Sequence, residues 1–224
     1  MKQSAKMSDY LTRTELKMSL LVLVVYAVGI AGMTIPYTRE FFVSLIPVVL
    51  ILSLAANFSF HRQPWDLKTI VSFSAIVLFS WIIEAAGVAT GIIFGNYTYG
   101  PALGLKFLET PLLIGFNWLL LIYGTSGIAE RLPLSPAGKV LLASLLMVIY
   151  DLILELAAPA LGMWQFEGGI APPRNYVAWF LFAGLFHTIL RVSAVKIINR
   201  VAPVIFVIQF IFFLTLILIF HFTK

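Results

Sequence analysis

The sequence predicts an all-α fold, a polytopic membrane helix bundle of about seven transmembrane helices with a cytoplasmic N-terminus. Hydrophobic residues fill 61% of the 224 positions, charged residues fill 11%, and the mean hydropathy is +1.00. These values lie outside the range of soluble globular domains. About seven windows are long enough to cross a hydrocarbon core roughly 30 Å thick. Lys and Arg concentrate in alternate connections between these windows, as they do in short cytoplasmic loops.

The apolar windows define the expected spans. They are Met18 to Ile35, Phe41 to Asn57, Ile70 to Ile93, Pro111 to Ile128, Val140 to Leu161, Tyr176 to Leu190, and Val201 to Phe220. The first span has full length and no cleavage site, so we expect a retained helix rather than a removed leader. The expected organisation is a cytoplasmic segment over 1–17, a single membrane domain over 18–220, and a C-terminal tail over 221–224.

Positive charge predicts the orientation of the spans. With the N-terminus inside, eleven of the fifteen basic residues fall in inner segments, and only Arg39, Lys106, Arg174 and Lys224 fall outside. An even number of spans would mix these two groups, so seven spans with an outer C-terminus are favoured. The same asymmetry explains the net charge of +5 without nucleic-acid binding.

Three carboxylic acids inside the spans are the candidate functional residues: Glu84, Asp151 and Glu155. Ionisable groups at membrane depth are rare and are functional candidates by default. Asp151 and Glu155 are four residues apart and therefore share one helix face. Two carboxyl groups this close cannot both ionise in a low dielectric, so one should keep its proton near neutral pH and be able to act as a general acid. The alternative is that they are protonated side chains that hydrogen-bond between helices.

The surroundings of the acids suggest a shared cavity near the outer leaflet. Glu84 and Asn117 lie at a depth similar to that of the pair in the fifth span. Gly87 lies on the face of Glu84 and would allow another helix to approach. Pro159 lacks an N–H and should bend the fifth span beside the pair.

Metal and cofactor sites are not expected. The chain has no Cys, and His61 and His187 have no second ligand at a suitable spacing. Aromatic residues gather near the outer interface and are equally well explained as an anchoring belt. These are Tyr97, Tyr99, Trp164, Tyr176 and Trp179.

Two blocks of residues resemble the signatures of the carotenoid 1,2-hydratase family, which includes bisanhydrobacterioruberin hydratases and γ-carotene 1′-hydroxylases. The first block is Trp81-Ile-Ile-Glu84, Gly87, Thr90-Gly91, Phe94-Gly95, Tyr97-Thr-Tyr99, Pro111 and Asn117-Trp118. The second is Asp151, Glu155, Pro159, Gly162, Trp164, Pro173, Asn175 and Trp179. Together they cover about the middle half of the chain. Leu156 and Phe166 stand where the family often has Pro and Trp, which leaves the particular end group open.

The resemblance implies a hydro-lyase that needs no cofactor and adds water across the terminal C1,C2 double bond of an acyclic carotenoid, giving a tertiary alcohol. It implies catalytic roles for Glu84, Asp151 and Glu155. Implied substrate-binding residues are Trp81, Tyr97, Tyr99, Asn117, Trp118, Trp164 and Asn175. The expected partners are the lipid-soluble carotenoid, water, the plasma membrane of a prokaryotic cell that the chain crosses several times, and other membrane enzymes of the carotenoid pathway.

Two other functions would use the same acids. A proton-coupled transporter would use them as a relay, with a water path to both faces. Against it, the inner halves of the spans carry almost no polar residues, and no inverted repeat is evident. A related membrane carotenoid cyclase would also protonate the substrate, but it would exclude water and leave the product mass unchanged.

Overall fold

The computed structural model describes residues 2–222, with side chains from Arg13 to His221. The helices are α1 (Lys2–Thr34), α2 (Arg39–Ser44), α3 (Ile46–Ser59), α4 (Leu67–Thr90), α5 (Leu113–Ala129), α6 (Pro136–Ala157), α7 (Pro173–Val192) and α8 (Val201–Phe222). The strands are β1 (Tyr97–Tyr99), β2 (Lys106–Phe107), β3 (Thr110–Pro111) and β4 (Trp164–Phe166). The expected tail over 221–224 lies partly outside the described residues.

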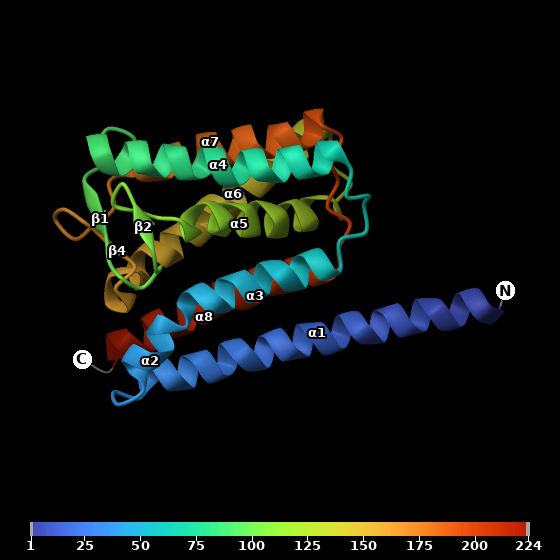
Figure 1. Ribbon diagram of the computed structural model, residues 1–224, viewed down its shortest axis with the longest axis horizontal. Coiled ribbons are helices and arrows are strands. Elements are labelled where there is room, and N and C mark those ends of the chain that lie inside the picture. Colours follow the sequence, from blue (N-terminus) through green and yellow to red (C-terminus); the bar gives the residue numbers. More distant parts are fainter. Residues whose placement is uncertain (1, 223–224) are drawn as a thin grey trace.

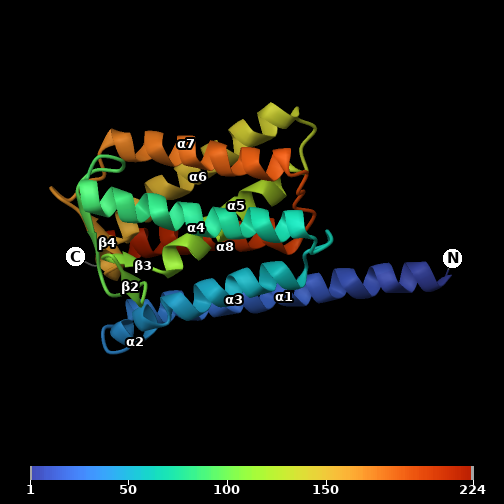
Figure 2. The same ribbon diagram turned by 45° about the horizontal axis from the view of Figure 1, so that its top comes forward.

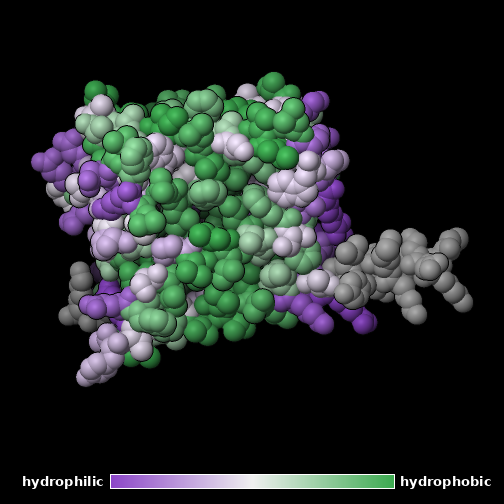
Figure 3. Space-filling view, viewed as in Figure 1, coloured by the Kyte–Doolittle hydropathy of each residue, from purple (hydrophilic) through white to green (hydrophobic). Residues whose placement is uncertain are grey.

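The helices form a bundle whose middle is apolar, and the predicted membrane helix bundle is confirmed. Within the described residues, five helical segments are long and apolar enough to cross a membrane: Arg13–Thr34, Leu67–Thr90, Pro136–Ala157, Pro173–Val192 and Val201–His221. Ile46–Ser59 and Leu113–Ala129 are shorter apolar helices. Figure 3 shows hydrophobic side chains over the centre of the visible face and hydrophilic ones toward its two ends. The count of seven spans and the cytoplasmic N-terminus stay predictions.

The central helix is α5, around which the others pack. Nearly all of its residues are buried, and it contacts α3, α4, α6, α7 and α8. Figure 1 shows α5 between α4 on one side and α8 on the other. A helix that is apolar all round is expected at such a position, because protein rather than lipid surrounds it.

The second predicted span is not one continuous helix, and this expectation was wrong. The chain instead forms α2 and α3, with a break at Leu45. The N–H of Leu45 donates to the carbonyl oxygen of Phe42, three residues earlier, at 3.2 Å. Pro47 has no N–H to give to the carbonyl of Val43, so the α-helical hydrogen bonds cannot continue through this point.

The fifth predicted span also ends differently. Instead of bending at Pro159, α6 stops at Ala157, and residues Pro159–Leu161 form one 3₁₀ turn. Gly162 follows in the left-handed conformation, with φ 62°. A helix end at this place sends the chain directly into β4, two residues after Gly162.

The four short strands of the described residues lie at one end of the bundle, where the sequence predicted only loops (Figures 1 and 2). β1 pairs antiparallel with β4, with Tyr97 opposite Phe166 and Tyr99 opposite Trp164. β2 and β3 form a separate hairpin. Both β1 and β4 alternate buried, exposed and buried residues, so each presents its aromatic side chains to the bundle.

Close packing of α4 on α5 gives a testable consequence. A Cβ atom at Gly115 would collide with the carbonyl oxygen of Val77, whereas one at Gly184 in α7 would find only the Ser144 hydroxyl at 3.7 Å. We expect Gly115→Ala to destabilise the protein by about 1–3 kcal/mol because two helices must separate. Gly184→Ala should be neutral or stabilising by about 0.5–1 kcal/mol because Ala is the better helix former. Apparent unfolding midpoints in detergent compare the two, and equal midpoints would contradict this packing.

Candidate active site

The three acids come together near the end of the bundle that carries the strands. Glu84 lies on α4, six residues before its end at Thr90, and Asp151 lies six residues before the end of α6 at Ala157. Six residues of helix correspond to about 9 Å. The carboxyl groups of Glu84, Asp151 and Glu155 are close enough for each to interact electrostatically with the others.

Glu84 accepts hydrogen bonds from three side chains. Its Oε2 accepts from the hydroxyls of Tyr97 at 2.6 Å and Tyr99 at 2.8 Å, and its Oε1 accepts from Nε1 of Trp118 at 2.8 Å. Only 4% of Glu84 is exposed, so these donors replace water. Three donors and no acceptor is the pattern that stabilises an ionised carboxylate.

The β1–β4 pair places the tyrosine donors over Glu84. Burial, together with the negative charge of Glu84, raises the pKa of both Tyr97 and Tyr99 well above the usual value of 10.0. Both side chains therefore remain hydroxyl donors throughout the physiological pH range. Their rings also contact each other, with centroids 5.4 Å apart, and the ring of Trp164 meets that of Tyr99 at 5.9 Å.

Asp151 has far fewer partners than Glu84. Its Oδ2 accepts from Nδ2 of Asn175 at 2.7 Å, while its buried Oδ1 has no hydrogen-bond partner. Asp151 is completely buried. An anion in such a site would lack most of the hydrogen bonds that offset its desolvation, so this environment suits a neutral carboxylic acid.

Glu155 is the most accessible of the three acids. It is partly exposed, and its Oε2 accepts from Nε1 of Trp164 at 3.0 Å. Since Trp164 is on β4 and pairs with Tyr99 on β1, the small sheet connects the partners of Glu155 with those of Glu84.

Two of the expected substrate-binding residues lie apart from this hydrogen-bonded cluster. Trp81 stacks on Phe107, with ring centroids 5.8 Å apart and planes at 20°, and its buried Nε1 has no partner. Asn117 is buried in α5, but within the described residues no hydrogen bond connects it to an acid. The structure therefore brings together the acids with Tyr97, Tyr99, Trp118, Trp164 and Asn175, and leaves Trp81 and Asn117 outside their hydrogen bonds.

Trp179 lies beside the candidate site, whereas the sequence assigned it only to the interface belt and the family signature. Its ring stacks on Trp118, with centroids 4.3 Å apart and planes at 25°. Trp179 follows Asn175 by four residues on α7, so both lie on one helix face. This four-residue spacing from Asn175 was the sequence feature that could have placed Trp179 beside the site. The residue that approaches Gly87 was also unexpected, since it is Phe94 of the following loop rather than another helix.

The halves of the helices at the end opposite the strands, which the sequence predicted to carry almost no polar residues, do carry several, and that expectation was wrong. His187 is buried and contacts the hydroxyls of Ser126 at 3.0 Å and Thr125 at 3.2 Å. Asn199 donates to the carbonyl oxygen of Asn57 at 2.7 Å. Within the described residues, no hydrogen bond connects these groups to the three acids, so they form separate polar clusters.

In the part of the chain that the structure describes, no group of three His, Asp or Glu side chains is placed so that it could hold one metal ion, and this includes the three acids. The site chemistry available from these residues is that of carboxyl, phenol, amide and indole groups. Such a set can donate and accept protons and can stabilise a cation by charge and by aromatic faces.

Comparison with known proteins identifies the family to which the chain belongs. The family model described as "Carotenoid biosynthesis protein" matches residues 41–223. A bisanhydrobacterioruberin hydratase from Haloarcula japonica is 31% identical over 132 residues, which cover 52% of this chain and 42% of that protein. The matched region thus spans less than half of the relative, and no solved structure matches. Because the family model covers most of the sequence, the chain belongs to the carotenoid biosynthesis protein family.

Proposed function

We propose that this chain is a carotenoid hydratase that adds water across the terminal C1,C2 double bond of an acyclic carotenoid. The observation that carries the proposal is the contrast between two neighbouring acids. Asp151 is fully buried with one unpartnered oxygen, while Glu84 has three hydrogen-bond donors. Family membership and the hydratase name of the relative from Haloarcula japonica supply the substrate class.

The reaction begins with proton transfer to an unactivated alkene. Neutral Asp151 gives its proton to C2, and the electrons of the double bond form the new C–H bond. This leaves a tertiary cation at C1. A carboxylic acid in a dry site suits this step because the developing cation is produced beside the negative charge of Glu84. Trp118, which is hydrogen-bonded to Glu84, is the aromatic group that would stabilise it further.

Water then completes the addition. Its oxygen bonds to C1, and it releases a proton to a nearby carboxylate, either Glu84 or Glu155. Partial exposure of Glu155 favours it as the residue nearest to the water supply. Return of one proton to Asp151 restores the starting state, so the net change is one water molecule added. The opposite assignment, with Glu155 as the acid, fits the structure less well. Glu155 is the more accessible of the two groups, whereas the acid should be the one kept neutral by burial.

The membrane orientation proposed from the sequence fits this scheme. Arg62, Arg131, Lys139, Arg191 and Arg200 lie in or beside connections at the end opposite the strands. If that end faces the cytoplasm, the N-terminus is inside and the acids lie toward the outer leaflet. We propose seven spans on this basis, with the two short apolar helices included, in the plasma membrane of a prokaryotic cell. Other membrane enzymes of the carotenoid pathway are the proposed partners.

Expression in cells that make an acyclic carotenoid tests the function directly. We expect extracted pigments to gain the mass of one water molecule per reacting end when the chain is present. A product of unchanged mass with a new ring would identify a cyclase instead, because cyclisation adds no atoms. Pigments identical to those of control cells would contradict both enzymatic functions and leave the transporter.

Replacement of Asp151 by Asn tests the proposed acid. Asn has nearly the same shape but no proton to give, so we expect hydration to fall by about 10²–10⁴-fold, the usual contribution of a general acid. Quantitative pigment analysis at matched expression measures the change. Glu167→Gln is the matched control, because Glu167 bonds Asn96 on the surface at 2.8 Å and should leave activity unchanged. Wild-type activity in Asp151→Asn would exclude this role.

Replacement of Tyr99 by Phe tests the support of Glu84. Loss of one hydrogen bond to a charged group costs about 1.5–3 kcal/mol. If that bond stabilises the charge that faces the cation, kcat should fall about 10- to 100-fold with little change in KM. Tyr37→Phe, at a fully exposed tyrosine, serves as the control. A change in KM alone would show that Tyr99 acts on binding instead.

A further inference from the structure

A long apolar groove runs along α4 on the side that faces α3. These two helices follow each other in the chain but pack on α5 rather than on each other (Figure 1). The hollow between them has a volume of about 610 Å³. Aromatic side chains line it: Phe58, Trp65, Phe73, Trp81, Phe107 and Phe116. A second hollow of about 600 Å³ shares Phe58 and Phe116 with the first and extends it along α3.

The groove leads toward the acids. Phe73, Val77 and Trp81 line it from α4. Glu84 follows Val77 by seven residues and Trp81 by three, so helical geometry places it on the same face, about one turn beyond Trp81. The stacked rings of Trp81 and Phe107 line the groove at this end. The buried, unpartnered Nε1 of Trp81 lies at the same place.

The β2–β3 hairpin holds Phe107 on Trp81 through an unusual turn. Leu108 and Glu109, the two residues between the strands, have φ of 49° and 57°. Two-residue hairpins of this kind normally use Asn and Gly, because other residues are strained at positive φ. Strained backbone of this sort concentrates where a side chain must be held at a functional position. Here the side chain it presents is Phe107, at the boundary between the groove and the acids.

We infer that this groove binds the polyene chain of the substrate, with Trp81 and Phe107 gripping the chain next to its reacting end. The inference rests on the proposed function, since it identifies where the carotenoid lies. A polyene is stiff because rotation about conjugated double bonds is restricted, so binding in a groove along a helix would cost it little conformational freedom. Its flat apolar chain also matches a lining of aromatic rings. This assigns to Trp81 a binding role outside the hydrogen-bonded cluster of the acids.

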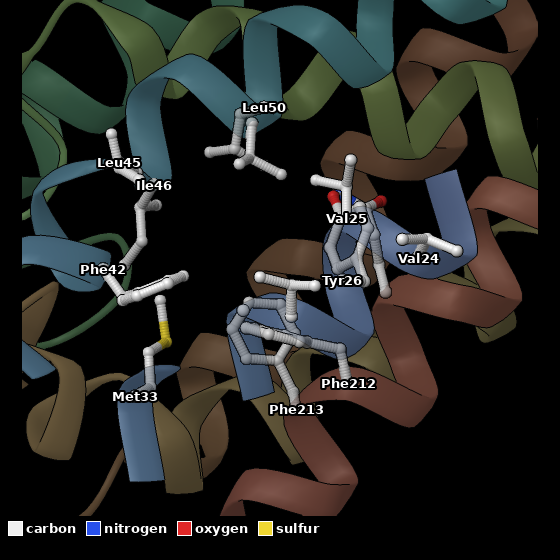
Figure 4. Close-up of a pocket in the computed structure, with 14 residues that line it drawn as sticks. Val24, Val25, Tyr26, Met33, Phe42, Leu45, Ile46, Leu50, Phe212 and Phe213 are labelled. Carbon is white, nitrogen blue, oxygen red and sulfur yellow. The ribbon is translucent and has the colours of Figure 1, made fainter. Parts of the chain in front are cut away.

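Another apolar cavity in the bundle provides a control. It has a volume of about 260 Å³ and lies between α1, α3 and α8, and its lining contains none of the acids and none of their hydrogen-bond partners. Figure 4 shows Val25, Tyr26, Leu50 and Phe212 around it. A Trp side chain introduced at Ser74 would fill the groove, while Trp introduced at Val25 would fill this other cavity. Both positions are exposed at the surface of the bundle, so neither change forces a larger side chain into the packed core.

Binding of lycopene to the purified full chain in lipid nanodiscs tests the inference. An achiral polyene acquires a circular dichroism band when it is held in a chiral site, so titration gives an apparent Kd. We expect Ser74→Trp to weaken binding at least tenfold and Val25→Trp to change it less than twofold. Unfolding midpoints confirm that both variants are folded. Equal binding by Ser74→Trp and wild type, or no induced band in wild type, would overturn the inference and leave the groove to ordinary lipid chains.

The same variants separate this inference from the proposed function. Asp151→Asn should still bind lycopene, because it changes the acid and not the groove. If wild type binds and Ser74→Trp does not, but no hydrated product forms in cells, the groove stands and hydration fails. If Ser74→Trp makes hydrated product at the wild-type rate, hydration stands and the groove assignment fails.

Discussion

The burial of carboxyl groups inside an apolar bundle is the constraint on which the rest of this structure depends. An ionised carboxylate removed from water is costly unless hydrogen-bond donors replace the water it loses. Glu84 obtains three such donors from two segments, the hydroxyls of Tyr97 and Tyr99 on β1 and the indole of Trp118 on α5. These groups can converge only if β1 crosses the end of the bundle and α5 packs tightly on α4. The hydrogen bonds of Glu84 therefore depend both on the position of β1 and on the packing of α5 against α4.

The supply of donors is unequal among the acids, and this inequality underlies the proposed chemistry. Glu84 has three donors, whereas Asp151 has one and Glu155 has one. Groups of the same type in different surroundings are a common way to obtain an acid and a base at one pH. Hydration of an alkene needs that combination, because one group must give a proton before another can accept one. A uniform set of partners would have favoured the same protonation state in all three.

A membrane enzyme that uses water must also keep its polar groups from lipid while admitting a substrate that dissolves in lipid. In the arrangement we propose, α4 serves both needs within one turn. Trp81 lies on the aromatic groove, and Glu84 lies in the hydrogen-bonded cluster under β1. The stacked pair of Trp81 and Phe107 stands between the two environments. In this proposal, about one turn of α4 separates the polyene-binding groove from the acids that react.

The membrane helix bundle and the identity of the three acids were determined by the sequence alone. Apolar length is a direct property of the chain, and an acid within an apolar stretch is visible without any neighbour. The break at Leu45 and the helix end at Ala157 were only partly predictable, since Pro47 and Pro159 interrupt the helical hydrogen bonds but do not determine whether a helix bends or stops.

The partners of each acid were decided only by tertiary structure. Tyr99 and Trp164 lie opposite each other on β1 and β4, which are too short for a strand pattern and are far apart in the chain. Their pairing follows from how α4 and α6 end, and so does the meeting of Glu84 with Tyr97, Tyr99 and Trp118. The placement of Trp81 on the groove depends in the same way on the rotation of α4 against α5. Local sequence cannot specify that rotation, because it results from the packing of side chains that come from separate parts of the chain.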